Sequence, residues 1–232
     1  MDLSKFSLAD LQTPFGRRAF PNASINLQSD LAVGDYDAQL QRLHDDLDRI
    51  FSRISLHPIH REHDSEDRTS IEIVNLLRFL NHTAEHEASY GGNCDVCVNE
   101  NDEFIWLGEA KIDYRNDHIM QGFRQLSDRY AKGDIRDGAL LIYCKNNPSE
   151  KVLEDWKAFL QNKDNRSKEY GLTFTGSGHN YFFTEHLNRA TGHIFTVKHI
   201  VISLLDTATD KSAVRRKKCS HSCEQCCKVL AP

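Results

Sequence analysis

The order of hydrophobic patterns along the chain predicts an α/β domain with a central mixed β-sheet flanked by helices. Apolar residues recur at helical spacing in several segments, and a strand-like alternation covers residues 104–112. A near-continuous apolar run over residues 138–144 is typical of a strand buried on both faces. The resulting order of helix, hairpin, helix, strand, helix and strand is that of an α/β fold.

Residues 1–60 are predicted to form an N-terminal extension with one amphipathic helix. Residues 15–30 look irregular, because Pro14, Gly16 and Pro21 act as breakers. Residues 35–54 carry apolar side chains at helical spacing, and this helix is expected to end before Pro58. We expect the helix to pack on its own domain, and a dimer interface is the alternative.

Residues 61–206 are predicted to form the core of the domain. After a polar loop, a helix with a wide apolar face covers residues 71–80, and either Asp67 or Thr69 is its expected cap. The remaining expected elements are a hairpin, helices over about 117–131 and 149–162, segments of strand and loop over 171–176 and 179–187, and a last strand over 194–205.

Composition sets modest limits. The chain has 232 residues, of which 39% are hydrophobic and 27% charged, as in soluble globular proteins. No run is long enough to cross a bilayer, and the N-terminus lacks the features of a secretory signal, so a cytoplasmic location is expected. Seven cysteines then indicate free thiols or metal ligands. With a net charge of −5, nucleic-acid binding requires a local basic groove or a partner.

The segment from Gly91 to Lys111 carries the clearest chemical pattern. Asp95 stands at the start of a short apolar strand, and a turn-rich gap separates it from an alternating strand that holds Glu109 and Lys111. Because residues i and i+2 of a strand share a face, Glu109 and Lys111 point to the same side as Ile105 and Leu107. Two carboxylates and an amine at one point can hold a divalent metal ion and activate water beside it.

This pattern of an Asp, a hairpin turn and Glu-Ala-Lys resembles the PD-(D/E)XK nuclease superfamily, over about residues 68–205. Cys94 stands where the superfamily often has proline. The resemblance implies a restriction-endonuclease-like core. It also implies that Asp95, Glu109 and the Ala110 carbonyl bind Mg²⁺, or alternatively Mn²⁺, and that Lys111 positions or polarises the attacking water.

The resemblance further implies a third carboxylate from the preceding helix. Glu72 is the candidate for this metal ligand, since it is placed at the start of the expected helix. A first-turn acid that only complements the helix dipole is the alternative interpretation. Glu85 and Glu87 are weaker candidates.

Gln125 is the candidate contact to the substrate backbone. Gln121, Gln125 and Arg129 form an i, i+4, i+8 stripe, and the segment resembles the glutamine-bearing helix of RecB-like branches. A solvated polar stripe is the alternative. Arg124 and Arg129 could likewise bind phosphate or only solubilise the helix.

Residues 207–232 form a basic, cysteine-rich tail. Its candidate zinc ligands are Cys219, His221, Cys223, Cys226 and Cys227, which follow a basic run from Arg215 to Lys218. The alternatives are a disordered tail with incidental thiols and a tail that becomes ordered only with a partner. The other notable thiols, Cys94 and Cys97, are interpreted as core or near-site residues, and His179 as a loop residue with a structural or solvent-exposed position.

Together these patterns predict a metal-dependent nuclease that hydrolyses phosphodiester bonds. DNA is preferred over RNA as the substrate, and an endonuclease that serves as the catalytic component of a prokaryotic restriction or antiviral defence system is the specific expectation. A protein partner or a homo-oligomer would supply targeting or control, and no membrane partner is expected. The alternatives are a non-catalytic nuclease-like module for binding or assembly, and a zinc-dependent regulatory protein built on the tail.

Overall fold

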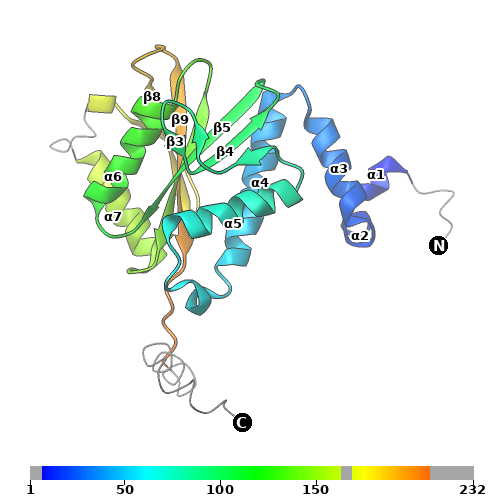
Figure 1. The fold of residues 1–232 in the computed structure, drawn as a ribbon, viewed down its shortest axis with the longest axis horizontal. Coiled ribbons are helices and arrows are strands. Elements are labelled where there is room, and N and C mark those ends of the chain that lie inside the picture. Colours follow the sequence, from blue (N-terminus) through cyan, green and yellow to red (C-terminus); the bar gives the residue numbers. More distant parts are fainter. Residues whose placement is uncertain (1–6, 163–168, 210–232) are drawn as a thin grey trace, which may run out of the picture.

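A seven-stranded mixed sheet forms the centre of the protein (Figure 1). The computed structural model describes residues 7–162 and 169–209. Across the sheet, the strands are β1 (Ala84–Glu85), β4 (Val96–Glu100), β5 (Phe104–Ile112), β6 (Asp137–Cys144), β9 (Ile194–Ser203), β8 (Tyr181–Leu187) and β7 (Thr173–Ser177). The pairs β5–β6 and β6–β9 are parallel and the others antiparallel, which confirms the predicted α/β class and mixed sheet.

Helices cover both faces of the sheet (Figure 1). On one face lie α4 (Tyr36–Ile54) and α5 (Glu66–Phe79). On the other lie α6 (Asn116–Arg124), the π-helical segment η3 (Gln125–Tyr130) and α7 (Ser149–Gln161). The connections from β5 to β6 and from β6 to β9 both place their helices on this second face. This is expected, because both connections join neighbouring parallel strands in the same direction across the sheet and such crossovers are right-handed.

Strand β5 packs between two hydrophobic cores. Trp106 and Ala110 contribute to the core under α4 and α5, whereas Leu107 contributes to the core under α6 and α7. All three side chains are fully buried. The alternation predicted for residues 104–112 is therefore confirmed, and it places Glu109 and Lys111 on the α6 side.

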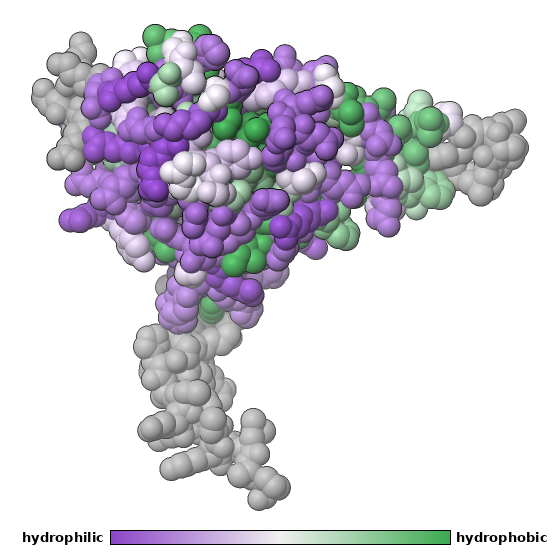
Figure 2. Space-filling model, turned by 45° about the horizontal axis from the view of Figure 1, so that its top comes forward, coloured by the Kyte–Doolittle hydropathy of each residue, from purple (hydrophilic) through white to green (hydrophobic). Residues whose placement is uncertain are grey.

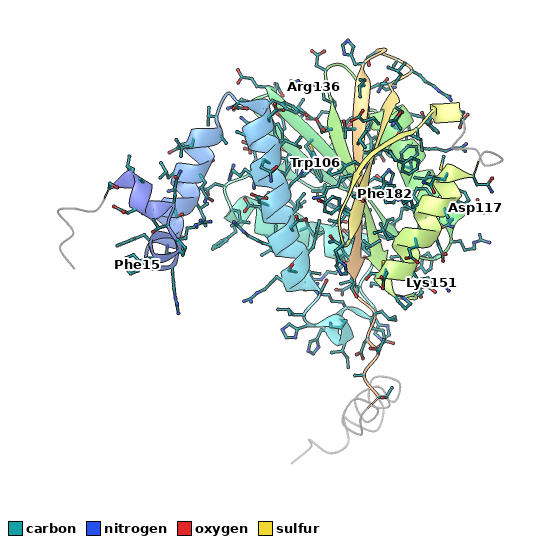
Figure 3. The ribbon with its side chains drawn as sticks, turned by 180° about the vertical axis from the view of Figure 1, so that it is seen from behind. Phe15, Trp106, Asp117, Arg136, Lys151 and Phe182 are labelled. Atoms are coloured by element: carbon teal, nitrogen blue, oxygen red, sulfur yellow. The ribbon has the colours of Figure 1, made fainter. Side chains whose placement is uncertain are left out.

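The prediction of irregular structure for residues 15–30 is wrong. The chain forms two helices here, α2 (Pro14–Ala19) and α3 (Pro21–Ala32), and a short helix, α1 (Leu8–Leu11), precedes them. Pro14 and Pro21 each occupy the first helical position, where proline costs no hydrogen bond and its fixed φ favours the helix. These helices extend away from the sheet, and Phe15 lies on this arm, far from Trp106 in the core (Figure 3).

Helix α4 packs on its own domain, as predicted. Its inward residues belong to the same core as Trp106, and three of them, Leu43, Leu47 and Ile54, are at most 2% exposed. The Asp35 side chain caps the helix by accepting a hydrogen bond of 3.1 Å from the Ala38 N–H. A short 3₁₀ turn, η2 (Pro58–Arg61), follows.

Two predicted helix boundaries need correction. Helix α5 begins at Glu66, and its cap is Ser65, whose hydroxyl accepts a hydrogen bond from the Arg68 N–H, rather than Asp67 or Thr69. The helix expected over residues 117–131 is regular only to Arg124 and then widens into the π-helical η3. The helical spacing of apolar residues cannot reveal this change of pitch.

The view in Figure 2 shows a mostly hydrophilic surface, with small apolar patches on the body and on the α1–α3 arm. Within the described ranges, no helix has both the length and the apolar character that a membrane span requires.

Replacing Leu43 with alanine tests whether α4 is part of the domain core. Because Leu43 is 0% exposed, we expect Leu43→Ala to lower the free energy of unfolding by about 3 kcal/mol, measured by urea denaturation. Leu31, on α3, is 60% exposed, so Leu31→Ala should change the free energy of unfolding by less than about 0.5 kcal/mol. Equal effects of the two substitutions would contradict this packing.

Candidate active site

The β4–β5 hairpin brings Asp95 beside the segment that holds Glu109 and Lys111. In the register of the hairpin, Val96 lies opposite Gly108, so Asp95 stands next to the following residues of β5. Asp95 Oδ2 accepts a hydrogen bond of 2.7 Å from the Ala110 N–H. The structure therefore brings together Asp95, Glu109 and Lys111, which we call the hairpin triad.

Glu109 and Lys111 form a buried ion pair. Lys111 Nζ lies 2.6 Å from Glu109 Oε1 and 2.7 Å from the Ala110 carbonyl oxygen. Glu109 is 2% exposed and Lys111 is 8% exposed, so the alternative of an exposed pair at a strand edge does not hold. Helix α6 lies directly over Lys111, because a Cβ atom at Gly122 would stand only 2.7 Å from Lys111 Cγ.

Glu66, in the first turn of α5, is the acid that the preceding helix delivers. Its Oε1 atom accepts hydrogen bonds from the Ile112 N–H at 2.7 Å and is 3.1 Å from His118 Nε2. Its Oε2 atom lies 3.8 Å from Lys111 Nζ. The carboxylate of Glu66 thus joins α5, the end of β5 and the hairpin triad.

The prediction of Glu72 as the third acid needs correction. The Glu72 carboxylate forms two hydrogen bonds with Arg61, of 2.6 Å and 2.8 Å, and the described residues give it no contact with the hairpin triad. Glu72 follows Glu66 by six residues, which turns its side chain roughly 120° away around the helix. Its role is structural, since it ties α5 to η2. The weaker candidates Glu85 and Glu87 are exposed.

Tyr130 connects the predicted substrate contact to the triad. Gln125 Nε2 lies 3.3 Å from the Tyr130 hydroxyl, which in turn donates a hydrogen bond of 2.8 Å to the Asn93 carbonyl. Burial raises the pKa of Tyr130, and the charge of Glu109 raises it further. Gln125 is therefore held at the edge of the site.

The expected stripe of Gln121, Gln125 and Arg129 is interrupted by the π-helical pitch of η3. Gln121 is exposed on α6. Arg129 is also exposed and packs over the Tyr130 ring, with its Cζ atom 5.6 Å from the ring centre. It also lies over Gly92, where a Cβ atom would be 2.5 Å from the guanidinium. The double glycine before Asp95 thus lets η3 approach the hairpin.

Burial perturbs the ionisation of all three triad residues. Burial, reinforced by the charge of Asp95, raises the pKa of Glu109 to about 7, although Lys111 and the nearby Tyr130 hydroxyl act in the opposite direction. The pKa of Asp95 is raised for the same main reason, partly offset by its hydrogen bond with Ala110. Burial alone would lower the pKa of Lys111, but the carboxylates of Glu109, Glu66 and Asp95 raise it overall. Such shifts are common at functional sites.

Two groups of atoms could hold a metal ion. The first comprises Asp95, Glu109 and the Ala110 carbonyl, and its Glu109 Oε2 atom is buried with no hydrogen-bond partner among the described residues. The second comprises Asp67, His86 and Asp95, whose ligand atoms all lie within 4.8 Å of one another. Asp95 belongs to both groups.

The other predicted candidates lie elsewhere. Cys94 and Cys97 are free, buried thiols in the core next to the triad, as interpreted. Arg124 pairs with Glu169 at 2.9 Å. His179 is exposed. The tail candidates Cys219, His221, Cys223, Cys226 and Cys227 lie outside the described residues.

Three site residues escaped the analysis of the sequence. Glu66 and Asp67 follow Ser65, and a serine with acids in the next positions is a recognisable helix start. That signal places the first turn of α5 at Glu66. His86 had no usable signal, because its position depends on two short ladders, β1 with β4 and β2 (Ala88–Ser89) with β3 (Asn93–Cys94).

Comparison of the chain with family models, with curated proteins and with solved structures found no match in any of the three. What the described residues establish is an α/β protein with a seven-stranded mixed sheet flanked by helices.

Glu109 should make the metal-free protein less stable as the pH rises. Its pKa moves from 4.5 in the unfolded chain to about 7 in the fold, so between these values only the unfolded chain releases the proton and stability falls with increasing pH. Glu109→Gln removes this loss. In EDTA, the free energy of unfolding of the Glu109→Gln protein, relative to that of the parent, should increase by up to about 3 kcal/mol between pH 4.5 and 7. Above pH 7 this difference should stay constant.

Urea denaturation at a series of pH values measures this difference. Glu103→Gln, at an exposed position in the turn of the same hairpin, is the matched control for the substitution itself. A difference between Glu109→Gln and the parent that does not change between pH 4.5 and 7 would contradict the prediction.

Proposed function

We propose that the protein is a metal-dependent nuclease, and that the hairpin triad hydrolyses phosphodiester bonds. One observation carries the proposal: half-buried Asp95 converges with buried Glu109 and Lys111, and one oxygen of Glu109 lacks a hydrogen-bond partner among the described residues. Burying an unpaired carboxylate oxygen costs about 1–3 kcal/mol, so a ligand for that oxygen is the simplest reason for it.

The donor set of the triad fits a hard divalent cation. Two carboxylates and a backbone carbonyl, from Asp95, Glu109 and Ala110, are all oxygen ligands, as Mg²⁺ prefers, and Mn²⁺ accepts the same set. When bound, such a cation supplies positive charge that stabilises the phosphate and helps water to ionise near neutral pH.

Lys111 provides the second positive charge. In the described conformation its ammonium donates to Glu109 and to the Ala110 carbonyl, which are two of the oxygens that would hold the cation. Once those oxygens are engaged, Lys111 has N–H donors free to orient the attacking water or to contact a phosphate oxygen. Glu66, 3.8 Å away, adds to the effect of Glu109 in raising the pKa of the Lys111 ammonium.

Residues at the edge of the site suit a nucleic-acid backbone. Gln125 offers an amide and Arg129 an exposed guanidinium, and both contact Tyr130 beside the triad. We propose DNA as the substrate. Because the chain carries a net charge of −5, a partner protein or a second copy would supply further contacts and targeting. An endonuclease subunit of a prokaryotic defence or restriction system fits this proposal.

Lys111→Ala should reduce cleavage at least about 100-fold, because the charge that positions water and phosphate is lost. The assay follows nicking and linearisation of supercoiled plasmid with Mg²⁺, and EDTA should abolish cleavage by the parent. Single-stranded DNA and RNA are tested in parallel to define the substrate.

Lys151→Ala is the matched control, since Lys151 is exposed on α7, away from the hairpin (Figure 3). It should cleave like the parent. Circular dichroism checks that Lys111→Ala is folded. A folded Lys111→Ala protein as active as the parent would overturn the proposal, as would the absence of cleavage of any nucleic acid by the parent.

Substitutions of two glutamates of helix α5, Glu66 and Glu72, distinguish a role at the site from a structural role. Glu66→Gln keeps a hydrogen-bond acceptor for the Ile112 N–H but removes the charge near Lys111, so cleavage should fall about tenfold or more. Glu72→Gln weakens the pair with Arg61, so it should lower the melting temperature and leave cleavage by the folded protein unchanged. The opposite pattern would restore Glu72 as the third acid.

A further inference from the structure

Asp67, His86 and Asp95 converge from three separate elements. Asp67 lies in the first turn of α5, His86 in the link between β1 and β2, and Asp95 in the bend between β3 and β4. One oxygen of each carboxylate and one ring nitrogen of His86 all lie within 4.8 Å of one another. Ligands of a single ion at about 2.1 Å stand up to roughly 4.2 Å apart, so small side-chain movements would bring these atoms together.

Two short ladders hold His86 in this position. Glu85 of β1 pairs with Cys97, and Ala88 of β2 pairs with Cys94, so both ends of the two-residue link lie beside Asp95. Glu87 adopts a left-handed backbone conformation, with φ of 56°, which turns the chain between the two ladders. Such a conformation is uncommon outside glycine, and here it keeps the imidazole next to Asp95.

The imidazole lacks a partner for one nitrogen. His86 Nε2 is screened from solvent and has no hydrogen-bond partner in the part of the chain that the structure describes. A buried polar atom without a partner costs free energy that a ligand would recover. Asp67 is exposed, so an ion can reach the group from solvent on that side.

We infer that Asp67, His86 and Asp95 form a second cation site, which selects a divalent transition metal such as Mn²⁺ over Mg²⁺. An imidazole nitrogen favours transition metals, whereas Mg²⁺ prefers oxygen ligands alone. The set differs from the all-oxygen group at Glu109 and shares only Asp95 with it. Three protein ligands leave coordination positions for water or a phosphate oxygen.

The second site does not depend on nuclease activity, although it would place a second positive charge beside the triad. Two cations that share a carboxylate are a common arrangement in phosphoryl-transfer enzymes. The metal-binding experiment below therefore stands apart from the cleavage assay, and either result can fail without the other.

Mn²⁺ binding to the full chain tests the inference. The Glu109→Gln protein, in which the all-oxygen group has lost a charged ligand, is stripped with EDTA and titrated with Mn²⁺ while the signal of free Mn²⁺ is followed by electron paramagnetic resonance. Pulsed measurements on bound Mn²⁺ should detect coupling to a ¹⁴N nucleus of His86. Adding His86→Gln should remove this coupling and weaken Mn²⁺ binding at least about tenfold.

His179→Gln, in the same Glu109→Gln background, is the matched control, because His179 is an exposed loop residue. It should retain both the coupling and the affinity. Candidate ligands in the tail are common to all these proteins, so they do not affect the comparison. Asp67→Asn should weaken Mn²⁺ binding without removing the ¹⁴N coupling.

Two results would overturn the inference. One is unchanged ¹⁴N coupling and affinity in the protein that carries His86→Gln, with circular dichroism confirming its fold. The other is displacement of bound Mn²⁺ by Mg²⁺ at equal concentration. If the parent cleaves no nucleic acid but has a His86-dependent Mn²⁺ site, this inference is kept and the nuclease proposal is rejected.

Discussion

The candidate site depends on one constraint, the packing of β5 between two hydrophobic cores. Because the strand alternates, fixing Trp106 and Ala110 under α4 and α5 forces Glu109 and Lys111 to the face under α6. A register shift of one residue would move the Trp106 side chain to the core under α6 and α7, and both charges to the core under α4 and α5. The same ladder also orients the Ala110 N–H toward Asp95, so packing and site geometry are set together.

Stability does not account for the buried charges. Taking an ion pair such as Glu109–Lys111 out of water costs several kcal/mol, and apolar residues of similar size are often equally stable or more stable. Here the pair is also incompletely satisfied, since Glu109 Oε2 has no hydrogen-bond partner within the described ranges. Glu72 and Arg61 offer a useful contrast, because that more exposed pair is matched through both carboxylate oxygens. Glu109 in the triad is thus incompletely paired, whereas Glu72 is fully paired with Arg61 of η2. This difference distinguishes an acid with an oxygen available to a ligand from an acid with a structural role.

The parts of the fold that local patterns specify could be predicted from the sequence. The alternation of residues in β5 and the short separation of the triad residues along the chain are sufficient to predict that these residues lie together. The same reasoning failed where one residue type has two roles, since Pro14 and Pro21 start helices instead of breaking them. Choosing Glu72 over Glu66 was an error of helix phase, caused by placing the helix start too late. His86 lay beyond local reasoning, because its position depends on strand pairings between segments separated in the sequence.

Lys111 links these features, because it occupies the oxygens that a cation would need. Its ammonium satisfies Glu109 Oε1 and the Ala110 carbonyl, so the metal-free fold tolerates a carboxylate whose pKa is raised to about 7. A cation that engaged those oxygens would require the ammonium to move. Gly122 leaves room for the Lys111 stem, because a Cβ atom on α6 at this point would stand only 2.7 Å from Lys111 Cγ. Glu66 offers the displaced ammonium its nearest alternative acceptor. Occupation of the carboxylates by a cation would therefore be coupled to release of Lys111. Packing explains the glycine at position 122 of α6, because any side chain there would meet the Lys111 stem.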